Sequence, residues 1–272
     1  MGENINRVLF VNSEMVPYLP ETDFACMTKA LAQGIQEKRV EIRSFMPRYG
    51  IINERKNQLH EVIRLSGMNI VIGDVDRPLV IKVASLPAAR MQVYFIDNED
   101  FFKRKAMYTD PDGNFFKDNG ERAIFFARGV LETVKKLRWS PDVIHCSGWI
   151  SHVLPLYLKK CYREDPIFSN SKVVLSLYGD TFEASLGDKF ADAVVFQGVG
   201  KESVKILDNP TGINLAKLAI DYSDGVIAGS EDCDASLVEY AKGKGIPVLG
   251  YDKGRISDGS FIGDYHDFYE GL

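Results

Sequence analysis

The sequence is poor in the features that mark several large classes of protein. Its four cysteines, in 272 residues, are widely spaced and form no C-x-x-C pair. We therefore expect free thiols in a reducing compartment, the cytoplasm. No apolar run approaches the roughly 18 residues of a membrane span, and the start MGENINRVLFVNSE leads into a strand without a signal peptide. These absences predict a protein that does not cross a membrane.

Positive charge and metal-binding patterns are also scarce. The chain has 33 Lys and Arg against 38 Asp and Glu, a net charge of −5, and no basic stripe. We therefore expect no nucleic-acid partner. The four histidines form no ligand pattern, and no G-x-G-x-x-G follows the first apolar segment. The sequence thus predicts no metal, no dinucleotide site of the usual kind and no cofactor.

The most informative stretch is residues 118–149, DNGERAIFFARGVLETVKKLRWSPDVIHCSGW. Apolar residues recur at helical spacing from Ile124 to Leu137, and Asp118 and Asn119 can cap the helix. Pro141 ends the pattern, and the strand 143–146 follows. A strand that ends in a polar loop is where open α/β sheets place their ligands.

The rest of the chain alternates strands with helices. We predict an α/β fold, a Rossmann-like three-layer domain with a mostly parallel sheet, because apolar runs typical of buried parallel strands alternate with helical patterns. The expected strands are 7–12, 40–46, 91–97, 143–146, 172–177 and 225–228. The domain is placed at 1–245, with a hairpin insertion at about 62–85 whose turn is Asp74–Arg77. Residues 246–272 are expected to form a C-terminal tail.

Several collinear motifs then identify a family. LFVNSEMVPY resembles S-E-x-x-P-[FY], MPRYG resembles L-P-x-Y-G, and DNGERAIFFARGVLE resembles D-N-x-x-R-[FY]-x-x-[FL]-x-x-x-x-L-E. YFIDNEDFF with MYTD, RWSPDVIHCSGW, and LAKLAIDYSDGVIAGS match three further motifs. Together they resemble the N-terminal half of bacterial glycogen synthases and plant starch synthases, glycosyltransferase family five, over residues 7–240.

This resemblance implies the N-terminal half of a GT-B glycosyltransferase, whose active site lies between two Rossmann-like domains. Members transfer glucose from ADP-glucose or UDP-glucose to an α-1,4-glucan. The second domain, which supplies most nucleotide contacts, is absent from this sequence. The resemblance therefore implies an α-glucan or nucleotide-sugar ligand and a possible separate chain that supplies the second domain.

Three family motifs are altered here. The family's K-T-G-G-L-[AG]-D becomes residues 20–26, PETDFAC, which loses a Lys and two Gly and gains negative charge. H-D-W-H becomes residues 147–150, SGWI, and the His of I-H-N becomes Tyr178. Because tyrosine cannot replace an imidazole in acid–base chemistry near neutral pH, we expect no catalytic residue and an isolated chain that is inactive.

Some positions remain compatible with ligand contact. The candidate substrate-binding residues are Glu14, Tyr18, Tyr108, Asp118, Asn119, Ser147, Trp149 and Tyr178. A structural role is an open alternative for several of them: Asp118 and Asn119, with Arg122, also suit a helix cap and an ion pair, and Trp149 suits packing. His145, at a strand end, is typical of a core histidine.

Two functions follow. The first is a glycogen/starch-synthase-like glycosyltransferase domain. The alternative is a non-catalytic relative that binds a glucan, a metabolite or a protein in a regulatory role. In either case we expect the ligand in the crevice beyond the strand ends, lined by residues 13–22, Tyr108, 147–151 and 178–181, where a neutral glucan suits the acidic rim better than a nucleotide.

Overall fold

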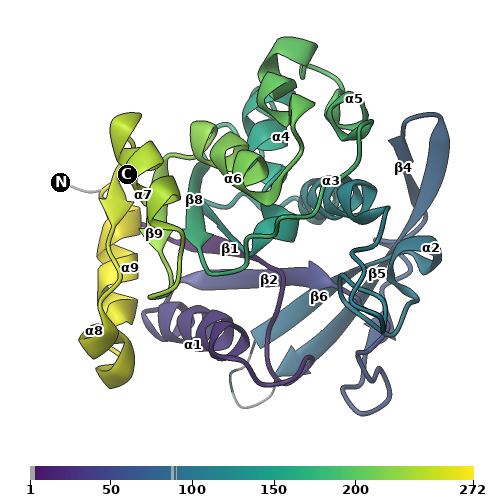
Figure 1. The fold of residues 1–272 in the computed structure, drawn as a ribbon. Coiled ribbons are helices and arrows are strands. Elements are labelled where there is room, and N and C mark those ends of the chain that lie inside the picture. The colour runs from purple at the N-terminus through teal and green to yellow at the C-terminus, as the bar shows by residue number, and fades with distance from the viewer. Residues whose placement is uncertain (1–3, 87–88, 90) are drawn as a thin grey trace.

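The computed structural model describes residues 4–86, 89 and 91–272. In this part of the chain a ten-stranded sheet forms the middle layer, in the order β10-β9-β8-β7-β1-β2-β6-β5-β3, with β4 paired to β5 (Figure 1). The strands are β1 Arg7–Asn12, β2 Glu41–Pro47, β3 His60–Glu61, β4 Met68–Ile72, β5 Val75–Leu86, β6 Met91–Asp97, β7 Val143–Ser147, β8 Lys172–Leu177, β9 Gly225–Ala228 and β10 Val248–Leu249. Pairing from β10 through β6 is parallel, and β5 joins antiparallel.

Helices cover both faces of this sheet. The helical segments are α1 Asp23–Glu37, α2 Glu99–Phe102, α3 Asn119–Leu137, η2 Trp149–Ser151, α4 Leu154–Cys161, α5 Phe190–Val194, η3 Lys201–Asp208, α6 Gly212–Asp221, α7 Ala235–Gly243, α8 Lys253–Asp258 and α9 Phe261–Glu270. Helices α1 and α9 lie together on one face, and α3, α4 and α6 lie on the other (Figure 1). The predicted three-layer α/β fold with a mostly parallel sheet is confirmed.

The central strands agree with the sequence prediction to within a residue. β7 lies inside the sheet between β1 and β8, with Leu9 opposite Ile144 and Ile144 opposite Val173. All five β7 residues are buried, as expected for a parallel strand covered on both faces. Because parallel strands end at the same edge, the loops after β1, β7, β8 and β9 gather there.

The predicted hairpin differs from the observed one. The turn is the Gly73-Asp74 pair, and β5 already begins at Val75, so the predicted turn Asp74–Arg77 is wrong. Gly73 has φ +58, the left-handed conformation that two-residue hairpin turns favour. β5 also pairs with β6 from Val80 to Leu86, so the hairpin is continuous with the main sheet.

Helix α3 is buried on more sides than its pattern predicts. Arg122, Arg128 and Thr133, outside the apolar stripe, are as inaccessible as the stripe itself. The reason is that α3 contacts the sheet, α4, α5 and η2 together. Asp118 stands at the N-cap position but makes no side-chain cap hydrogen bond, because its carboxylate is paired elsewhere.

The segment after residue 245 is folded onto the domain. β10 extends the sheet beside β9, and α9 packs against α1. Tyr265 and Tyr269 of α9 are buried, and the Phe268 ring lies against Gly225, where a Cβ would come within 2.8 Å of it. Residues 246–272 thus extend the sheet by one strand and, beside α1, cover part of one of its faces.

None of the helices in the described ranges combines the length and the apolar content that a membrane span requires. The compartment stays a prediction.

Candidate functional site

A groove of about 870 Å³ opens at the carboxyl edge of the sheet. It runs past the ends of β1, β8, β9 and β10 and the first two turns of α1. It is lined by Glu14, Thr22, Asp23, Phe24, Cys26, Met27, Ala30, Tyr178, Gly179, Asp180, Gly229, Ser230, Glu231, Asp232, Tyr251, Lys253, Ile256 and Phe261. Its location is where open α/β sheets bind ligands, and its volume suits a small molecule.

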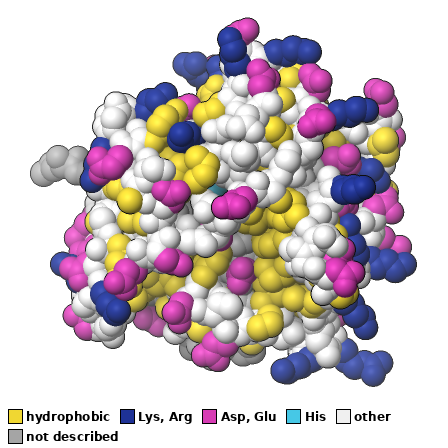
Figure 2. Space-filling model, viewed as in Figure 1, with side chains coloured by type: hydrophobic (Ala, Val, Ile, Leu, Met, Phe, Trp, Pro, Cys, Tyr) yellow, Lys and Arg dark blue, Asp and Glu magenta, His cyan; other side chains and the backbone are white. Residues whose placement is uncertain are grey.

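The groove is acidic. Five of its lining residues carry carboxyl groups and one, Lys253, carries an ammonium group, which pairs with Glu231 at 3.2 Å. Figure 2 views this side of the molecule and shows acidic side chains over the region of α1, α8 and the loop after β9. Because the carboxylates of the lining repel an anionic ligand, the groove favours a neutral or cationic ligand over a diphosphate.

Asp180 is the most perturbed of these carboxyl groups. Its partial burial raises its pKa to about 7, and the nearby charges of Glu14 and Asp232 act in the same direction. The backbone N–H of Trp149 donates to Asp180 Oδ2 at 2.7 Å and opposes part of that rise. Burial also raises the pKa of Glu14, whose carboxylate accepts a hydrogen bond from Thr22 Oγ1 at 3.3 Å. Asp180 therefore takes up a proton more readily than an ordinary aspartate.

The N-terminus of α1 enters the groove with its own cap. Thr22 Oγ1 accepts a hydrogen bond from the Ala25 N–H at 3.0 Å, and Asp23 places a carboxylate in the first turn. A bare helix N-terminus attracts phosphate groups. At this helix N-terminus Thr22 Oγ1 already accepts a backbone hydrogen bond, and the Asp23 carboxylate already supplies the negative charge that a phosphate would bring. The structure therefore offers no anion site at this end of α1.

Tyr178 forms part of the groove wall and fills space. Its ring lies 4.1 Å from the Phe24 ring, and a Cβ at Gly229 would come within 2.7 Å of its Cζ. The ring is thus held between an aromatic side chain and a backbone segment. Its hydroxyl is buried and has no hydrogen-bond partner in the part of the chain that the structure describes, and burial raises its pKa well above the usual value. A tyrosine so placed does not exchange protons near pH 7.

Gly148, in the altered H-D-W-H motif, cannot be replaced by a larger residue without strain. Its φ is +90, and a Cβ there would lie 2.0 Å from Ser13 Oγ. An aspartate at this position would need a different backbone conformation and a displaced Ser13. The backbone conformation of Gly148 and its packing against Ser13 therefore disfavour an aspartate at this position.

Tyr108 and Trp149 lie together beside the groove, outside its lining. Their ring centroids are 4.7 Å apart, and Phe115 and Phe182 complete an aromatic cluster with Trp149. The Tyr108 hydroxyl shares a 2.7 Å hydrogen bond with the Tyr49 hydroxyl. Burial raises the pKa of Tyr108, and the charges of Glu14 and Asp180 add to that rise. Because Trp149 contacts the Tyr108 ring and its backbone N–H donates to Asp180, the tyrosine pair lies close to the acidic end of the groove.

Asp118 and Asn119 are engaged with the protein itself. Asp118 forms an ion pair with Arg104 at 2.6 Å. Asn119 is fully buried, donates to the Tyr108 carbonyl at 2.9 Å and accepts from Arg122. The structure thus shows buried contacts of Asn119 and an ion pair of Asp118, but the partner of Asp118 is Arg104 and its side chain does not cap the helix. Ligand binding by these two residues stays a prediction.

Three other sequence-predicted positions are interior. Tyr18 packs edge-on against Phe95 at 4.9 Å. Ser147 is buried at the end of β7. His145 is fully buried, with Nε2 2.6 Å from Ser176 Oγ and Nδ1 2.5 Å from the Tyr269 hydroxyl. Burial lowers the pKa of His145 to about 3, so it stays neutral and joins α9 to the sheet.

Two of the eight candidate residues, Glu14 and Tyr178, line the groove directly. Sequence reasoning did not extend the crevice to the loop after β9 (residues 229–232) or to the segment 251–261. The first had a usable signal, because the strand 225–228 was predicted and its carboxyl end should face the same edge. The second had none, because only packing places that segment over the groove.

One group of side chains in the described residues has the composition of a metal site. His266, Asp267 and Glu270 of α9 place one ligand-type atom each within 4.8 Å of the others. The His266 Nδ1 is 3.7 Å from Asp267 Oδ1 and 3.8 Å from Glu270 Oε2. All three residues belong to one helix and none lines the groove. The groove itself needs no cofactor to explain its lining.

Comparison with known proteins agrees with this geometry. The family described as "Starch synthase catalytic domain" matches residues 7–248. The chain is 36% identical to a glycogen synthase of Chlorobium limicola over 219 residues, which cover 80% of this chain and 44% of that protein. It is 40% identical to a glycogen synthase of Chlorobium luteolum over 179 residues, 65% of this chain and 37% of that protein. The chain thus spans about half the length of the curated relatives it matches.

A solved structure shares the fold. The catalytic domain of starch synthase IV from Arabidopsis thaliana, bound to ADP and acarbose, aligns with a TM-score of 0.68 at 18% identity, over 91% of this chain and 51% of that chain. The parallel sheet, the groove at its carboxyl edge and the match over residues 7–248 lead to one conclusion. This chain belongs to the starch synthase catalytic domain family, which includes glycogen synthases.

Proposed function

We propose that this chain is the acceptor-side half of a glycogen- and starch-synthase-type glucosyltransferase. In this proposal its groove binds a neutral α-glucan, and the chain alone does not transfer glucose from ADP-glucose or UDP-glucose. The observation that carries the proposal is the groove lining, in which five carboxyl groups and a capped helix N-terminus stand where a diphosphate would need cations and free N–H groups.

Sugar rings fit this lining better than phosphates do. Carboxylates accept hydrogen bonds from sugar hydroxyls, and protein hydroxyls both donate to them and accept from them. Aromatic side chains offer apolar contact to the faces of the sugar rings. Phe24, Tyr251 and Phe261 supply the aromatic surface, and Glu14 and Asp180 supply the polar groups. The starch synthase IV relative was solved with acarbose and ADP, which supports a saccharide ligand for the family.

The absence of transfer is proposed on two observations. Tyr178 stands where the family has a His, and burial raises the pKa of its phenol well above the usual value, so it cannot exchange protons near neutral pH. Gly148 has no room for the family's Asp. Since stabilisation of the leaving diphosphate is a large part of such catalysis, an acidic groove without it predicts an inactive half-site.

A titration tests the binding. Maltoheptaose added to the labelled protein should shift the backbone amide signals of Thr22, Phe24, Tyr178 and Asp180, with ADP producing no comparable change. Glu202→Gln, far from the groove, should leave the titration unchanged, and Asp180→Leu should weaken it. Signals that move only on another face, or tight ADP binding without a response to glucan, would overturn the proposed ligand.

A transfer assay tests the inactivity. With radiolabelled ADP-glucose or UDP-glucose and glycogen, the chain should incorporate no label above background. Turnover near about 1 s⁻¹, within the ordinary enzyme range, would overturn this part of the proposal.

The alternative is an enzyme completed by a second chain. It is favoured by the match to about half the length of the relatives. It predicts that the C-terminal domain of a relative, added in trans, restores transfer. If no combination restores it, a non-catalytic glucan-binding role is the better conclusion.

A further inference from the structure

Arg122 is a buried cation that forms no salt bridge with any of the described residues. Its side chain is fully inaccessible. The guanidinium lies over the rings of Phe102 (5.1 Å), Phe116 (5.5 Å) and Tyr49 (5.9 Å). Burial lowers its pKa. Aromatic faces stabilise a cation, but they do not replace the water that a guanidinium loses on burial.

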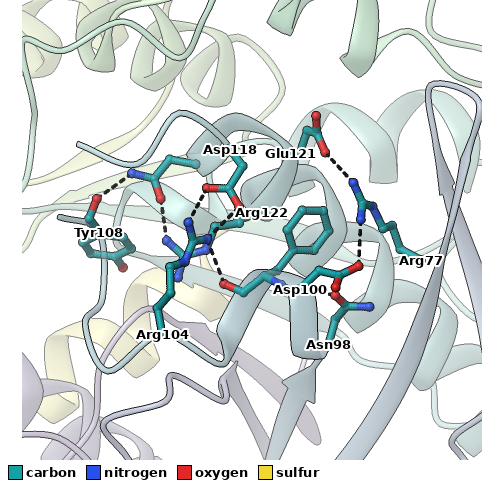
Figure 3. Close-up of polar contacts among 10 residues, drawn as sticks. Arg77, Asn98, Asp100, Arg104, Tyr108, Asp118, Glu121 and Arg122 are labelled. Atoms are coloured by element: carbon teal, nitrogen blue, oxygen red, sulfur yellow. Dashed lines mark hydrogen bonds and ion pairs between the residues drawn. The ribbon is translucent and has the colours of Figure 1, made fainter. Parts of the chain in front are cut away.

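The Arg122 guanidinium has one hydrogen-bond partner among the described residues. Its Nη1 donates to Asn119 Oδ1 at 2.5 Å, while Nε and Nη2 are buried without a partner. The carboxylate of Asp118, whose charge also acts on Arg122, forms its salt bridge with Arg104 at 2.6 Å. Figure 3 shows Arg104 and Arg122 next to each other beneath Asp118. Packing alone would be served better by a methionine, so the arginine needs another explanation.

The hydrogen bond to Asn119 leads to the groove. Asn119 Nδ2 donates to the Tyr108 carbonyl at 2.9 Å, and the Phe116 N–H donates to the same oxygen at 2.9 Å. The Tyr108 hydroxyl then forms a hydrogen bond with the Tyr49 hydroxyl, and its ring packs on Trp149. The backbone N–H of Trp149 donates to Asp180 Oδ2. One continuous set of contacts thus joins Arg122 to a carboxyl group of the groove.

We propose that Arg122 is a positioning residue for the groove. It fixes Asn119, and through Asn119 the loop 105–117, so that Tyr108 and Trp149 hold Asp180 in place for a glucan. This inference rests on the proposed glucan binding. Arginine suits the task because its planar group can contact several rings and donate in a fixed direction, which an ammonium group cannot do.

The same helix supplies a matched control. Arg128 is also buried and also lacks a carboxylate partner among the described residues. Its guanidinium lies over Phe196 and donates to the Val71 carbonyl, away from the loop 105–117. Arg128→Met therefore removes a buried cation from α3 without touching the contacts to Tyr108.

The first measurement is amide hydrogen exchange by mass spectrometry and NMR. Arg122→Met should speed exchange across residues 105–117, above all at the Phe116 amide, by about tenfold or more, and Arg128→Met should not. If Arg122→Met does not fold, Arg122→Lys takes its place with the same expectation, because it keeps a charge but loses the planar contacts. Unchanged exchange in this loop, with the protein folded, would overturn the inference whatever the ligand proves to be.

The second measurement is maltoheptaose affinity below the unfolding transition. Arg122→Met should weaken binding by about tenfold, while Arg128→Met leaves it within about twofold. In a Tyr108→Ala background Arg122→Met should have no further effect on affinity, although any effect on stability persists. Additive losses of affinity would show that Arg122 does not act through Tyr108 and would overturn the inference. A wild-type protein that ignores glucan would instead overturn the proposed function, and the positioning role for glucan with it.

Discussion

The carboxyl-edge groove and the interior behind it handle charge in opposite ways. The groove gathers Glu14, Asp180 and Asp232 around open space, and burial, with a smaller contribution from the charges of the other two carboxylates, raises the pKa of Asp180 to about 7. The interior holds His145 and His152 neutral, with pKa values lowered to about 3 by burial, and holds Arg122 charged between aromatic rings. A group in an open groove can be compensated by a ligand, by water or by a proton. A buried group must be neutral or must be stabilised by neighbouring protein groups.

The two buried histidines of the interior differ in their hydrogen bonding. Both ring nitrogens of His145 have partners, but those of His152 have none among the described residues. His152 therefore carries the cost of a buried polar ring without a compensating bond. The interior is not uniformly optimised, and its weak point lies in the turn between η2 and α4, close behind Trp149.

The largest expected effect is at the boundary between the two regions. Gly148→Ala should lower the free energy of unfolding by about 2–4 kcal/mol, because the residue has φ +90 and its Cβ would meet Ser13. Denaturant unfolding followed by circular dichroism measures the change. Gly200→Ala, at a position where a Cβ meets nothing within 4 Å, should stay within about 0.5 kcal/mol. A Gly148→Ala variant as stable as Gly200→Ala would contradict the tight packing described for this loop.

A smaller effect tests the interior through pH. The pKa of His152 is lower in the folded than in the unfolded state, so its contribution to stability is complete above about pH 6.5 and is lost as pH falls toward 3. Between about pH 6.5 and pH 5 this one group should cost the wild type about 2 kcal/mol. His152→Leu, of similar volume and without buried polar atoms, should lose about that much less over the same range. Parallel stability curves for the two proteins would show that His152 can be protonated in the folded state.

The smallest effect tests the groove and has the opposite sign. The pKa of Asp180 is raised on folding, so its contribution to stability is present below about pH 4 and is lost as pH rises through 7. Asp180→Asn should therefore gain about 1–2 kcal/mol relative to the wild type between about pH 4 and pH 8, the estimate being reduced for partial exposure. Glu202→Gln is the control outside the groove. A gain that is independent of pH would mean that the Asp180 carboxyl group is not perturbed.

The strands and their direction were determined by the sequence itself. Apolar runs such as 7–12 and 172–177 leave no polar face for solvent, so they can only be buried strands of a parallel sheet, and the helices between them fix their alternation. The family resemblance, carried by short motifs spread over residues 7–240, is likewise a property of the chain order. The same local reasoning placed Glu14 and Tyr178 at the carboxyl edge, because a residue that follows a parallel strand has nowhere else to be.

The tertiary structure alone decided which polar groups meet. Arg104 lies 14 residues before Asp118, and nothing in the local pattern shows that Arg104, rather than Arg122, pairs with Asp118 while the Tyr108 carbonyl accepts from Asn119. The segment 251–261 faces the groove only because α9 packs on α1 and Tyr269 bonds His145, 124 positions away in the chain. Periodicity records what each segment needs to bury, but the partner that buries it is chosen by packing between distant segments, where side-chain volume and hydrogen-bond geometry decide together.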